Sequence, residues 1–179
     1  MIAIIAEKPS VGLDIARVVG ADTRNDGYCS GNGYMVTWAL GHLVSLAMPD
    51  VYGYTKTTAE ELPMLPVPFR LVSRQIRTDR GMVTDIAATK QLKVIDSVFS
   101  KCDSIIVATD AGREGELIFR WIYAFLECTK PFRRLWISSL TDEAIRKGLE
   151  ELKDGTEYDS LYAAADSRAK ADWLVGYPR

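Results

Sequence analysis

The residues best able to do chemistry are gathered in one short stretch, VATDAGREGELIFRW, at positions 107–121. An apolar run ends there at Asp110, a turn of small residues follows, and Arg113 opens a predicted helix. Glu114 and Glu116 lie in the first turn of that helix. Carboxylates held so close together repel one another, so a folded protein needs something that offsets this repulsion.

Three explanations of the crowding are open on the residues alone. Carboxylate oxygens could bind Mg²⁺, which keeps several waters and completes its shell with a substrate phosphate. One crowded carboxyl could have a raised pKa and act as a general acid. Alternatively, Asp110 could cap the helix while Glu114 and Glu116 complement its dipole, which is the commoner explanation for an isolated acidic motif.

A second apolar run, Met1–Ala6, also ends in an acidic residue, Glu7, and Lys8 follows at once. Open α/β sheets bind ligands beyond the carboxyl ends of their strands. If the two runs are neighbouring strands, Glu7 and Asp110 face one crevice. Lys8 and Arg113 would be its cations, suited either to phosphate oxygens or to ion pairs with the carboxylates. The second acidic strand end favours a functional site.

The elements that must position these residues alternate between strands and helices. Strands are predicted at Met1–Ala6, Ser104–Ala108 and Phe132–Ile137, with a short one at Phe69–Val72 and a hairpin in 27–40 that turns at Gly31-Asn32-Gly33. Helices are predicted at Val11–Val19, Met82–Phe99, Arg113–Leu126, Asp142–Leu152 and Glu157–Val175, the fourth capped by Thr141. Pro49–Pro68 is interpreted as a surface-loop insertion. This order predicts an α/β fold with a mostly parallel sheet flanked by helices.

The composition is that of an ordinary globular domain. The chain has 179 residues, of which 47% are hydrophobic and 26% charged, and its formal net charge is -2, so any basic surface must be local. The three cysteines form no C-x-x-C pair, and no signal peptide or apolar stretch of about 18 residues is found. We therefore expect a cytoplasmic protein with free thiols. The core is expected to include all four tryptophans, Trp38, Trp121, Trp136 and Trp173.

Four separated blocks of the sequence resemble one known family. The blocks EKPSVGLDIARVVG, TWALGHLVSLAMPDVY, ATDAGREGELIFRWIY and SRAKADWLVG resemble, in order, the type IA DNA topoisomerases, specifically the topoisomerase III branch. The resemblance runs from Ile2 to Gly176. It implies a Toprim domain, a Rossmann-like fold that is also present in bacterial primases and some nucleases. This domain carries a glutamate after its first strand and an Asp-x-Asp signature after a later one.

The resemblance also implies roles for single residues. Glu7 resembles the glutamate that does acid–base work at the 3′-oxygen, and Lys8 the lysine that stabilises charge on the phosphate. Asp110 and Glu114 resemble Mg²⁺ ligands, with Glu7 as a third. Arg113 resembles the arginine beside the scissile phosphate. The implied catalytic residues are therefore Glu7, Lys8 and Arg113.

One position departs from the family pattern. Gly112 stands where many members have the second aspartate of Asp-x-Asp, so one metal ligand is missing. This departure weakens a two-metal interpretation and predicts a single Mg²⁺, held by Asp110, Glu114 and Glu7 with water filling the shell. We expect weaker Mg²⁺ affinity rather than lost chemistry.

Further residues could bind DNA or be structural. Arg168, in the last block, is expected near DNA together with Lys8 and Arg113, although Arg168 and Lys170 could equally form a solvated face. His42 is either structural or helps to shape the crevice. A loose basic stretch could contact phosphates or be a solvated loop, and it contains Arg70, Arg74, Arg77 and Arg80.

The activity that the resemblance implies is covalent catalysis on DNA. A tyrosine attacks a single-strand phosphodiester and keeps the 5′-phosphate, another strand passes, and religation follows. None of the eight tyrosines has the family's nucleophile context, so we expect an N-terminal fragment that cannot relax DNA alone. Its expected partners are single-stranded or duplex DNA and the remaining domains of the same polypeptide; no membrane is expected, and the oligomeric state is expected to be monomeric.

The expected domains are a Toprim domain at 1–155 and the start of a following helical domain at 156–179. Two other functions are weighed against this one. A Toprim nuclease or primase-type domain would need metal but no tyrosine domain, and the GHL and ADWLVG blocks argue against it. A non-catalytic nucleic-acid-binding module would not need Glu7 next to Lys8.

Overall fold

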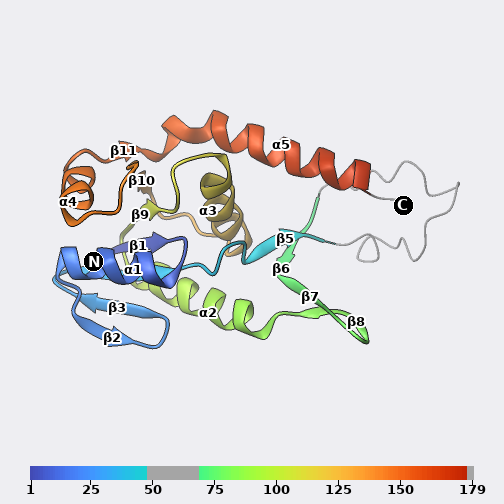
Figure 1. Cartoon of the computed structure of the whole chain (residues 1–179), viewed down its shortest axis with the longest axis horizontal. Coiled ribbons are helices and arrows are strands. Elements are labelled where there is room, and N and C mark those ends of the chain that lie inside the picture. The colour runs from blue at the N-terminus through green and yellow to red at the C-terminus, as the bar shows by residue number, and fades with distance from the viewer. Residues whose placement is uncertain (48–68, 177–179) are drawn as a thin grey trace, which may run out of the picture.

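A computed structural model describes residues 1–47 and 69–176, and its central feature is a seven-stranded sheet (Figure 1). The strand order is β11-β10-β9-β1-β4-β3-β2. These strands are β1 (Ile2–Ala6), β2 (Thr23–Asn25), β3 (Tyr28–Gly31), β4 (Tyr34–Trp38), β9 (Ser104–Ala108), β10 (Phe132–Arg134) and β11 (Lys153–Asp154). The helices are α1 (Pro9–Val19), α2 (Ile86–Lys101), α3 (Arg113–Phe125), α4 (Asp142–Glu150) and α5 (Asp159–Gly176), with a short 3-10 helix η3 (Gly155–Tyr158) before α5.

The four central strands are parallel. β1 lies between β4 and β9 and pairs with both in parallel, and β10 continues the parallel set beyond β9. At the two edges, β11 and the β2–β3 pair run antiparallel. β1 and β9 are apolar on both faces because helices cover both sides of the sheet. The predicted α/β fold with a central parallel sheet is therefore confirmed.

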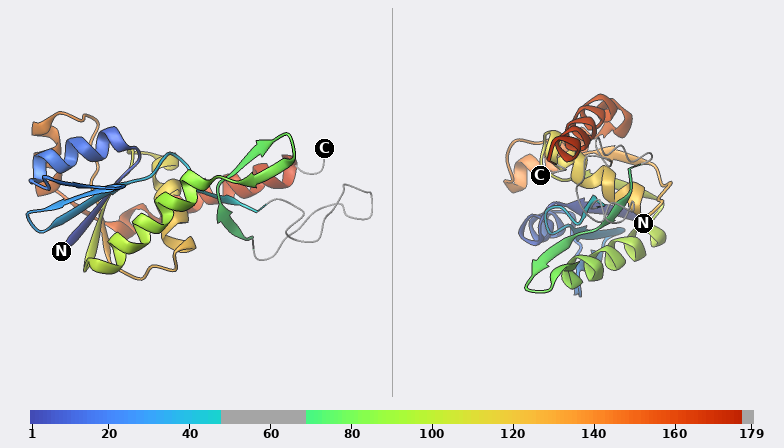
Figure 2. Two further views of the ribbon diagram at one scale, coloured as in Figure 1. Left: turned by 90° about the horizontal axis from the view of Figure 1, so that it is seen from below. Right: turned by 90° about the vertical axis from the view of Figure 1, so that its right-hand side faces the viewer.

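Helices form a layer on each face of the sheet (Figure 2). One core lies between the sheet and helices α1 and α4, where Ile15 and Ile145 are fully buried. The other lies between the sheet and helices α2 and α3, where Ile95 and Phe119 are buried. Helix α5 packs on α3, and the indole of Trp121 donates to Asp166 of α5 at 2.9 Å. This bond holds α5 against the second half of α3.

The predicted hairpin is present as β3 and β4. Its turn consists of Asn32 and Gly33, whose φ angles of 52° and 83° are both positive. Two positive φ angles are the mark of the type I′ turn that suits the twist of a two-residue hairpin. β7 (Gln75–Thr78) and β8 (Gly81–Thr84) form a second hairpin, and β5 (Val44–Leu46) pairs in antiparallel fashion with β6 (Leu71–Ser73). The predicted loop at Pro49–Pro68 lies outside the described residues.

Several predicted boundaries were wrong. The helix expected from Met82 begins only at Ile86, because the Asp85 carboxylate accepts from the Ala87 amide at 3.0 Å and caps it there. Met82 lies instead in β8. β10 ends at Arg134 rather than at Ile137. The short strands β2 and β11 were not predicted at all.

Three of the four tryptophans lie in the core as expected, but Trp136 does not. Its exposed fraction is 41%, whereas Trp38, Trp121 and Trp173 are at most 7% exposed. Trp136 follows the end of β10 and stacks on Tyr158 of η3, with ring centroids 4.8 Å apart. The strand ends three residues earlier than predicted, so Trp136 lies beyond the sheet and its side chain reaches the surface.

Candidate active site

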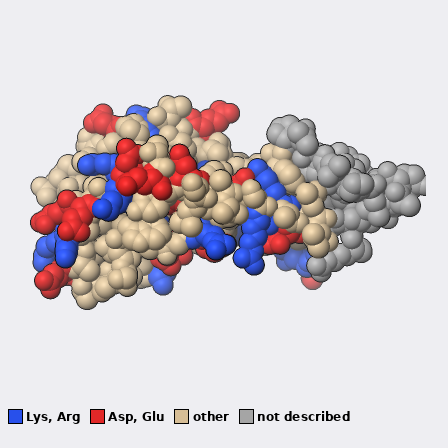
Figure 3. Space-filling model, turned by 90° about the horizontal axis from the view of Figure 1, so that it is seen from above, with Lys and Arg blue, Asp and Glu red and all other residues tan. Residues whose placement is uncertain are grey.

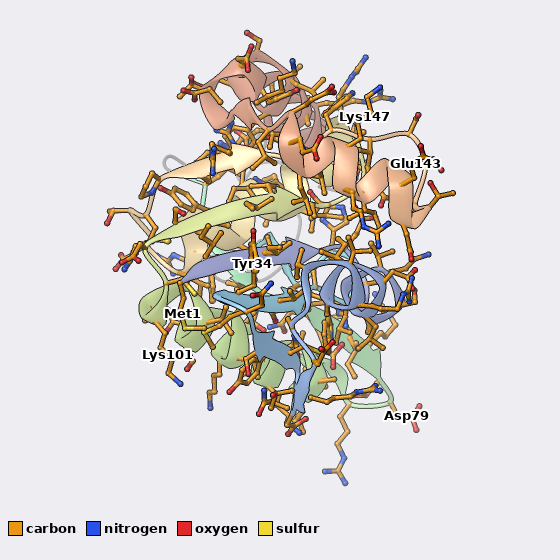
Figure 4. The ribbon with its side chains drawn as sticks, turned by 90° about the vertical axis from the view of Figure 1, so that its left-hand side faces the viewer. Met1, Tyr34, Asp79, Lys101, Glu143 and Lys147 are labelled. Carbon is orange, nitrogen blue, oxygen red and sulfur yellow. The ribbon has the colours of Figure 1, made fainter. Side chains whose placement is uncertain are left out.

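The site lies where the central strands end. Met1 and Tyr34, labelled in Figure 4, mark the ends at which β1 and β4 begin, and the site is at the opposite ends. Ala6 of β1 lies beside Ala108 of β9, so the residues after them come together. The Asp110 amide donates to Oε1 of Glu7 at 3.0 Å. The two acidic strand ends are thus neighbours in the structure; that they face one ligand crevice stays a prediction.

Glu7 is in an environment that disfavours its charge. Partial burial raises the pKa of the Glu7 carboxyl, and the nearby charge of Asp110 raises it further, although the Asp110 amide opposes the shift. A carboxyl of this kind holds a proton to a higher pH than an ordinary glutamate does. The same pair of carboxylates offers only oxygen ligands, which suits Mg²⁺ bound through one or two carboxylates and water.

Replacing Glu7 by glutamine is expected to stabilise the chain at neutral pH. Because the folded-state pKa of Glu7 is raised, its carboxyl favours folding only at low pH, and this contribution is lost as pH rises through the folded-state pKa. We expect a Tm increase of about 2 °C at pH 7.5 in EDTA, since relieving one partly exposed repulsion is worth less than about 1 kcal/mol.

The increase should vanish well below the unfolded-state pKa of glutamate, about 4.3, because the Glu7 carboxyl is then protonated in both the folded and the unfolded chain. Thermal unfolding of wild type and Glu7→Gln at several pH values measures this. An equal or lower Tm for the variant at pH 7.5 would contradict the assigned repulsion. Glutamine keeps the oxygen that accepts from Asp110, so that hydrogen bond is not at issue.

Glu114 is turned toward a different partner. Its Oε2 lies 2.9 Å from Nε2 of His42, whose ring packs edge-on against Trp121 at 6.2 Å. The loop that carries His42 is tied to the site, because the Gly41 amide donates to the Glu7 carbonyl at 3.2 Å. His42 therefore helps to shape the crevice, one of the two roles that the sequence left open.

Arg74 holds this loop through hydrogen bonds to its main chain. Its Nη1 donates to the carbonyls of Leu40 and His42 at 2.6 and 3.1 Å, and its guanidinium pairs with Asp85 at 2.9 Å. One arginine of the basic stretch is thus structural. Arg77 and Arg80 remain exposed on the β7–β8 hairpin.

The three predicted metal ligands are brought together only in part. Glu7 and Asp110 adjoin, whereas Glu114 is exposed and pairs with His42. Within residues 1–47 and 69–176, no group of three or more His, Cys, Asp or Glu side chains is arranged to hold a metal ion. Glu114 could approach Glu7 and Asp110 only if its contact with His42 were broken.

Gly112 has a backbone that other residues rarely adopt. Its φ is 145°, and it precedes the first residue of α3, although a Cβ built there would meet nothing within 4 Å. Extended backbone with positive φ is essentially restricted to glycine. An aspartate at this position would be strained, so a Gly112→Asp variant would change the turn as well as the number of carboxylates.

Glu116 lies in the interior and not in the crevice. Its exposed fraction is 1%, and its two carboxylate oxygens lie 3.2 Å from Nε of Arg120 and 3.3 Å from Nε of Arg134. Burial raises the pKa of Glu116 despite these two arginines. The sequence placed Glu116 among the candidate crevice carboxylates; helical periodicity instead turns it toward the core.

An open groove of about 450 Å³ lies at the start of α3, and its lining includes Glu114 but neither Glu7 nor Asp110. Arg113 and Glu114 line it from α3, His42 from the loop, and Arg168 from α5. Arg113 and Arg168 are both exposed, whereas Lys170 pairs with Asp166 at 2.8 Å. The structure thus brings Arg168 to Arg113, over 50 residues away in the chain. Lys8 precedes α1, is exposed, and is not among the lining residues of this groove.

Charge on the surface is mixed in sign. On the face that Figure 3 presents, acidic and basic side chains are interspersed and neither sign covers the face. A phosphate would therefore meet individual lysine and arginine side chains and not a broad basic surface, as the net charge of -2 predicts. No helix in the described part of the chain is both long and apolar enough to cross a membrane.

Comparisons with known proteins agree with the fold and with the sequence blocks. Residues 2–140 match the family model described as the Toprim domain. The chain is 50% identical over 178 residues to DNA topoisomerase 3 of Shouchella clausii, covering 97% of this chain and 23% of that protein. DNA topoisomerase 3 of Bacillus licheniformis is 47% identical over 177 residues, with the same two coverages. The chain thus spans 23% of the length of these relatives.

A solved structure supports the same fold. Full-length topoisomerase I from Thermotoga maritima superposes with a TM-score of 0.51 at 18% sequence identity. The superposition covers 85% of this chain and 21% of that one. With the family match over residues 2–140, the strand order and the acidic strand ends, these findings establish that the chain belongs to the Toprim family.

Proposed function

We propose that this chain is the Toprim portion of a type IA DNA topoisomerase of the topoisomerase III branch. In this role it supplies the acidic site for single-strand DNA cleavage and religation by a tyrosine on another domain. The observation that carries the proposal is the 50% identity, over 97% of the chain, to proteins named DNA topoisomerase 3. Such a site needs adjoining carboxylates and exposed cations, and the chain supplies Glu7 beside Asp110 and a groove lined by Arg113 and Arg168.

Glu7 and Asp110 are the residues that would hold Mg²⁺, with Glu114 as a third ligand once it leaves His42. Their donor set fits this ion, because it consists of carboxylate oxygens whose mutual repulsion a cation relieves. Bound there, Mg²⁺ would neutralise charge on the DNA phosphate. Gly112 brings no carboxylate, which favours one ion over two.

The chain's own residues would act on the two ends of the cleaved strand. Glu7 can give a proton to the departing 3′-oxygen as the tyrosine–phosphate bond forms and take it back on religation; while it holds that proton, Asp110 would be the carboxylate that holds the cation. Arg113 and Arg168 line one groove and can hold phosphate oxygens through their guanidinium forks. Lys8, at the start of α1, adds a mobile positive charge near Glu7.

We also propose a division of the chain. Residues 1–155 form the Toprim domain, and 156–179 begin a helical domain that continues in a longer, monomeric polypeptide. The family match supports this division because it ends at residue 140, before α5 begins. Helix α5 contacts helix α3, where Trp121 donates to Asp166. Arg168 of α5 would then bring a contribution from the next domain to the site.

The complete gene product is the object that tests this function. We expect it to relax negatively supercoiled plasmid in Mg²⁺ without ATP and to trap a single-stranded oligonucleotide through a 5′-phosphotyrosine bond. The 179-residue chain alone should do neither, because its chemistry needs a tyrosine from elsewhere.

Two outcomes would overturn the proposal. Mg²⁺-dependent cleavage by the chain alone, with no covalent protein–DNA product, would identify a nuclease. Retarded migration of single-stranded DNA by the chain, with no cleavage by the complete gene product, would identify a binding module.

A further inference from the structure

A fully buried arginine lies directly beneath the acidic pair. Arg134 is the last residue of β10, pairs with Val107 of β9, and has an exposed fraction of 0%. Arginine is rarely buried completely, since its charge loses the solvation of water. Here Glu116 supplies an opposite charge 3.3 Å from Nε of Arg134, so the pair is neutral inside the protein. The ion pair with Glu116 explains how a buried arginine is tolerated. It does not explain the contacts of the two terminal nitrogens, Nη1 and Nη2.

The two terminal nitrogens of Arg134 bind the chain that leads into the site. Nη1 donates to the Val107 carbonyl at 3.1 Å and to the Thr109 hydroxyl at 3.0 Å. Nη2 donates to the carbonyl of Asp110 at 2.8 Å. All three acceptors lie in four consecutive residues, at the end of β9 and in the turn that follows. One rigid fork therefore sets the path of the chain at the catalytic turn.

The main chain of Asp110 is held on both sides. The peptide before its α-carbon donates to Glu7 at 3.0 Å, and the peptide after it accepts from Arg134 at 2.8 Å. Gly115 packs directly against the Asp110 carbonyl, so closely that a Cβ at position 115 would overlap the carbonyl oxygen. With both flanking peptide planes fixed, the direction of the Asp110 Cα–Cβ bond is fixed as well.

We propose that Arg134 is a positioning residue for the Asp110 carboxylate. It acts through the carbonyl of Asp110, not by touching the carboxylate, DNA or a cation. The role depends on the planar fork, which a lysine cannot reproduce. The proposal rests on the proposed function in taking Glu7 and Asp110 as the reactive pair, but it concerns only the geometry of that pair.

The test separates this local role from a general one in stability. Arg134→Met alone would leave the Glu116 carboxylate buried without its partner, which itself destabilises the fold. The double variant Arg134→Met/Glu116→Leu removes both charges and keeps similar volume. Arg120 also loses Glu116 but keeps its ion pair with Asp159 at 2.8 Å, so the variant should fold with a Tm close to wild type. Amide hydrogen exchange and the amide proton shift of Asp110 are then measured by NMR on the ¹⁵N-labelled chain.

In the double variant we expect the Asp110 amide to exchange at least about tenfold faster than in wild type, because the turn opens locally. Its proton shift should move as the bond to Glu7 lengthens, while amides in the middle of β1 stay within about twofold of wild type. Arg133→Met is the matched control, since Arg133 is the exposed neighbour on the same strand. It should change neither reading.

Unchanged exchange and shift at Asp110 in the folded double variant would overturn the proposal. Should the double variant not fold, Arg134→Lys keeps a positive charge opposite Glu116 and is judged by the same two readings. Neither reading involves a metal or DNA. Failure of the proposed function would therefore appear in the cleavage assay and leave this result unaltered.

Discussion

Replacing Gly115 by alanine should destabilise the chain by about 3 kcal/mol and lower its Tm by about 6–12 °C. Gly115 lies in the first turn of α3, and an added Cβ would overlap the carbonyl oxygen of Asp110. That oxygen cannot move aside, because Arg134 holds it at 2.8 Å. Helix propensity alone predicts the opposite sign, a gain of about 1 kcal/mol for alanine over glycine in a helix. Thermal and urea unfolding of the variant therefore decide between the two.

Gly33→Ala is the control for this variant. Gly33 has a φ of 83° but open space around its α-carbon, so alanine there should cost only the conformational strain, about 1 kcal/mol. A Gly115→Ala chain that is as stable as wild type, or more stable, would show that the close approach of α3 to the Asp110 turn is wrong.

Asp110→Asn should lower the rate of Mg²⁺-dependent cleavage by the complete gene product about 100-fold. Asparagine keeps the size of the side chain and the main-chain bonds to Glu7 and Arg134, but it removes one of the two adjoining negative charges. A cation that needs both carboxylates is then held weakly. Single-turnover cleavage of an end-labelled single-stranded oligonucleotide, measured over a range of Mg²⁺ concentrations, gives the rate.

Asp103→Asn controls for the loss of a carboxylate elsewhere. Asp103 is exposed and pairs with the N-terminal amine at 3.1 Å, at the end of the sheet far from the site. It should cleave at the wild-type rate. If Asp110→Asn also cleaves at that rate throughout the Mg²⁺ range, Asp110 is only the residue that leads into the helix.

The parts of the site that the sequence predicted are those fixed by local pattern. Two apolar runs bounded by acidic residues were enough to place Glu7 beside Asp110, because buried strands of this kind become neighbours in a parallel sheet. The apolar spacing of α3 likewise placed Arg113 at its start. These inferences needed only the order of residues along short segments.

The parts that escaped prediction depend on contacts between distant segments. His42 and Glu114 are 72 positions apart, and nothing near either residue indicates the other. Arg134 falls in the predicted strand Phe132–Ile137, and its burial depends on contacts with Glu116 and with residues 107–110, which are distant in the sequence. The helix start at Ile86 was missed for a local reason, since Asp85 is a standard capping residue that the apolar Met82 and Val83 obscured.

The most direct test of the central claim is a Mn²⁺ titration of the 179-residue chain, followed by electron paramagnetic resonance, with Mn²⁺ standing in for Mg²⁺. The account predicts about one bound ion for wild type, at least about tenfold weaker binding for Asp110→Asn and for Glu7→Gln, and wild-type binding for Asp103→Asn. Equal binding by wild type and Asp110→Asn, or none by wild type at millimolar Mn²⁺, would contradict the claim that Glu7 and Asp110 form a cation site.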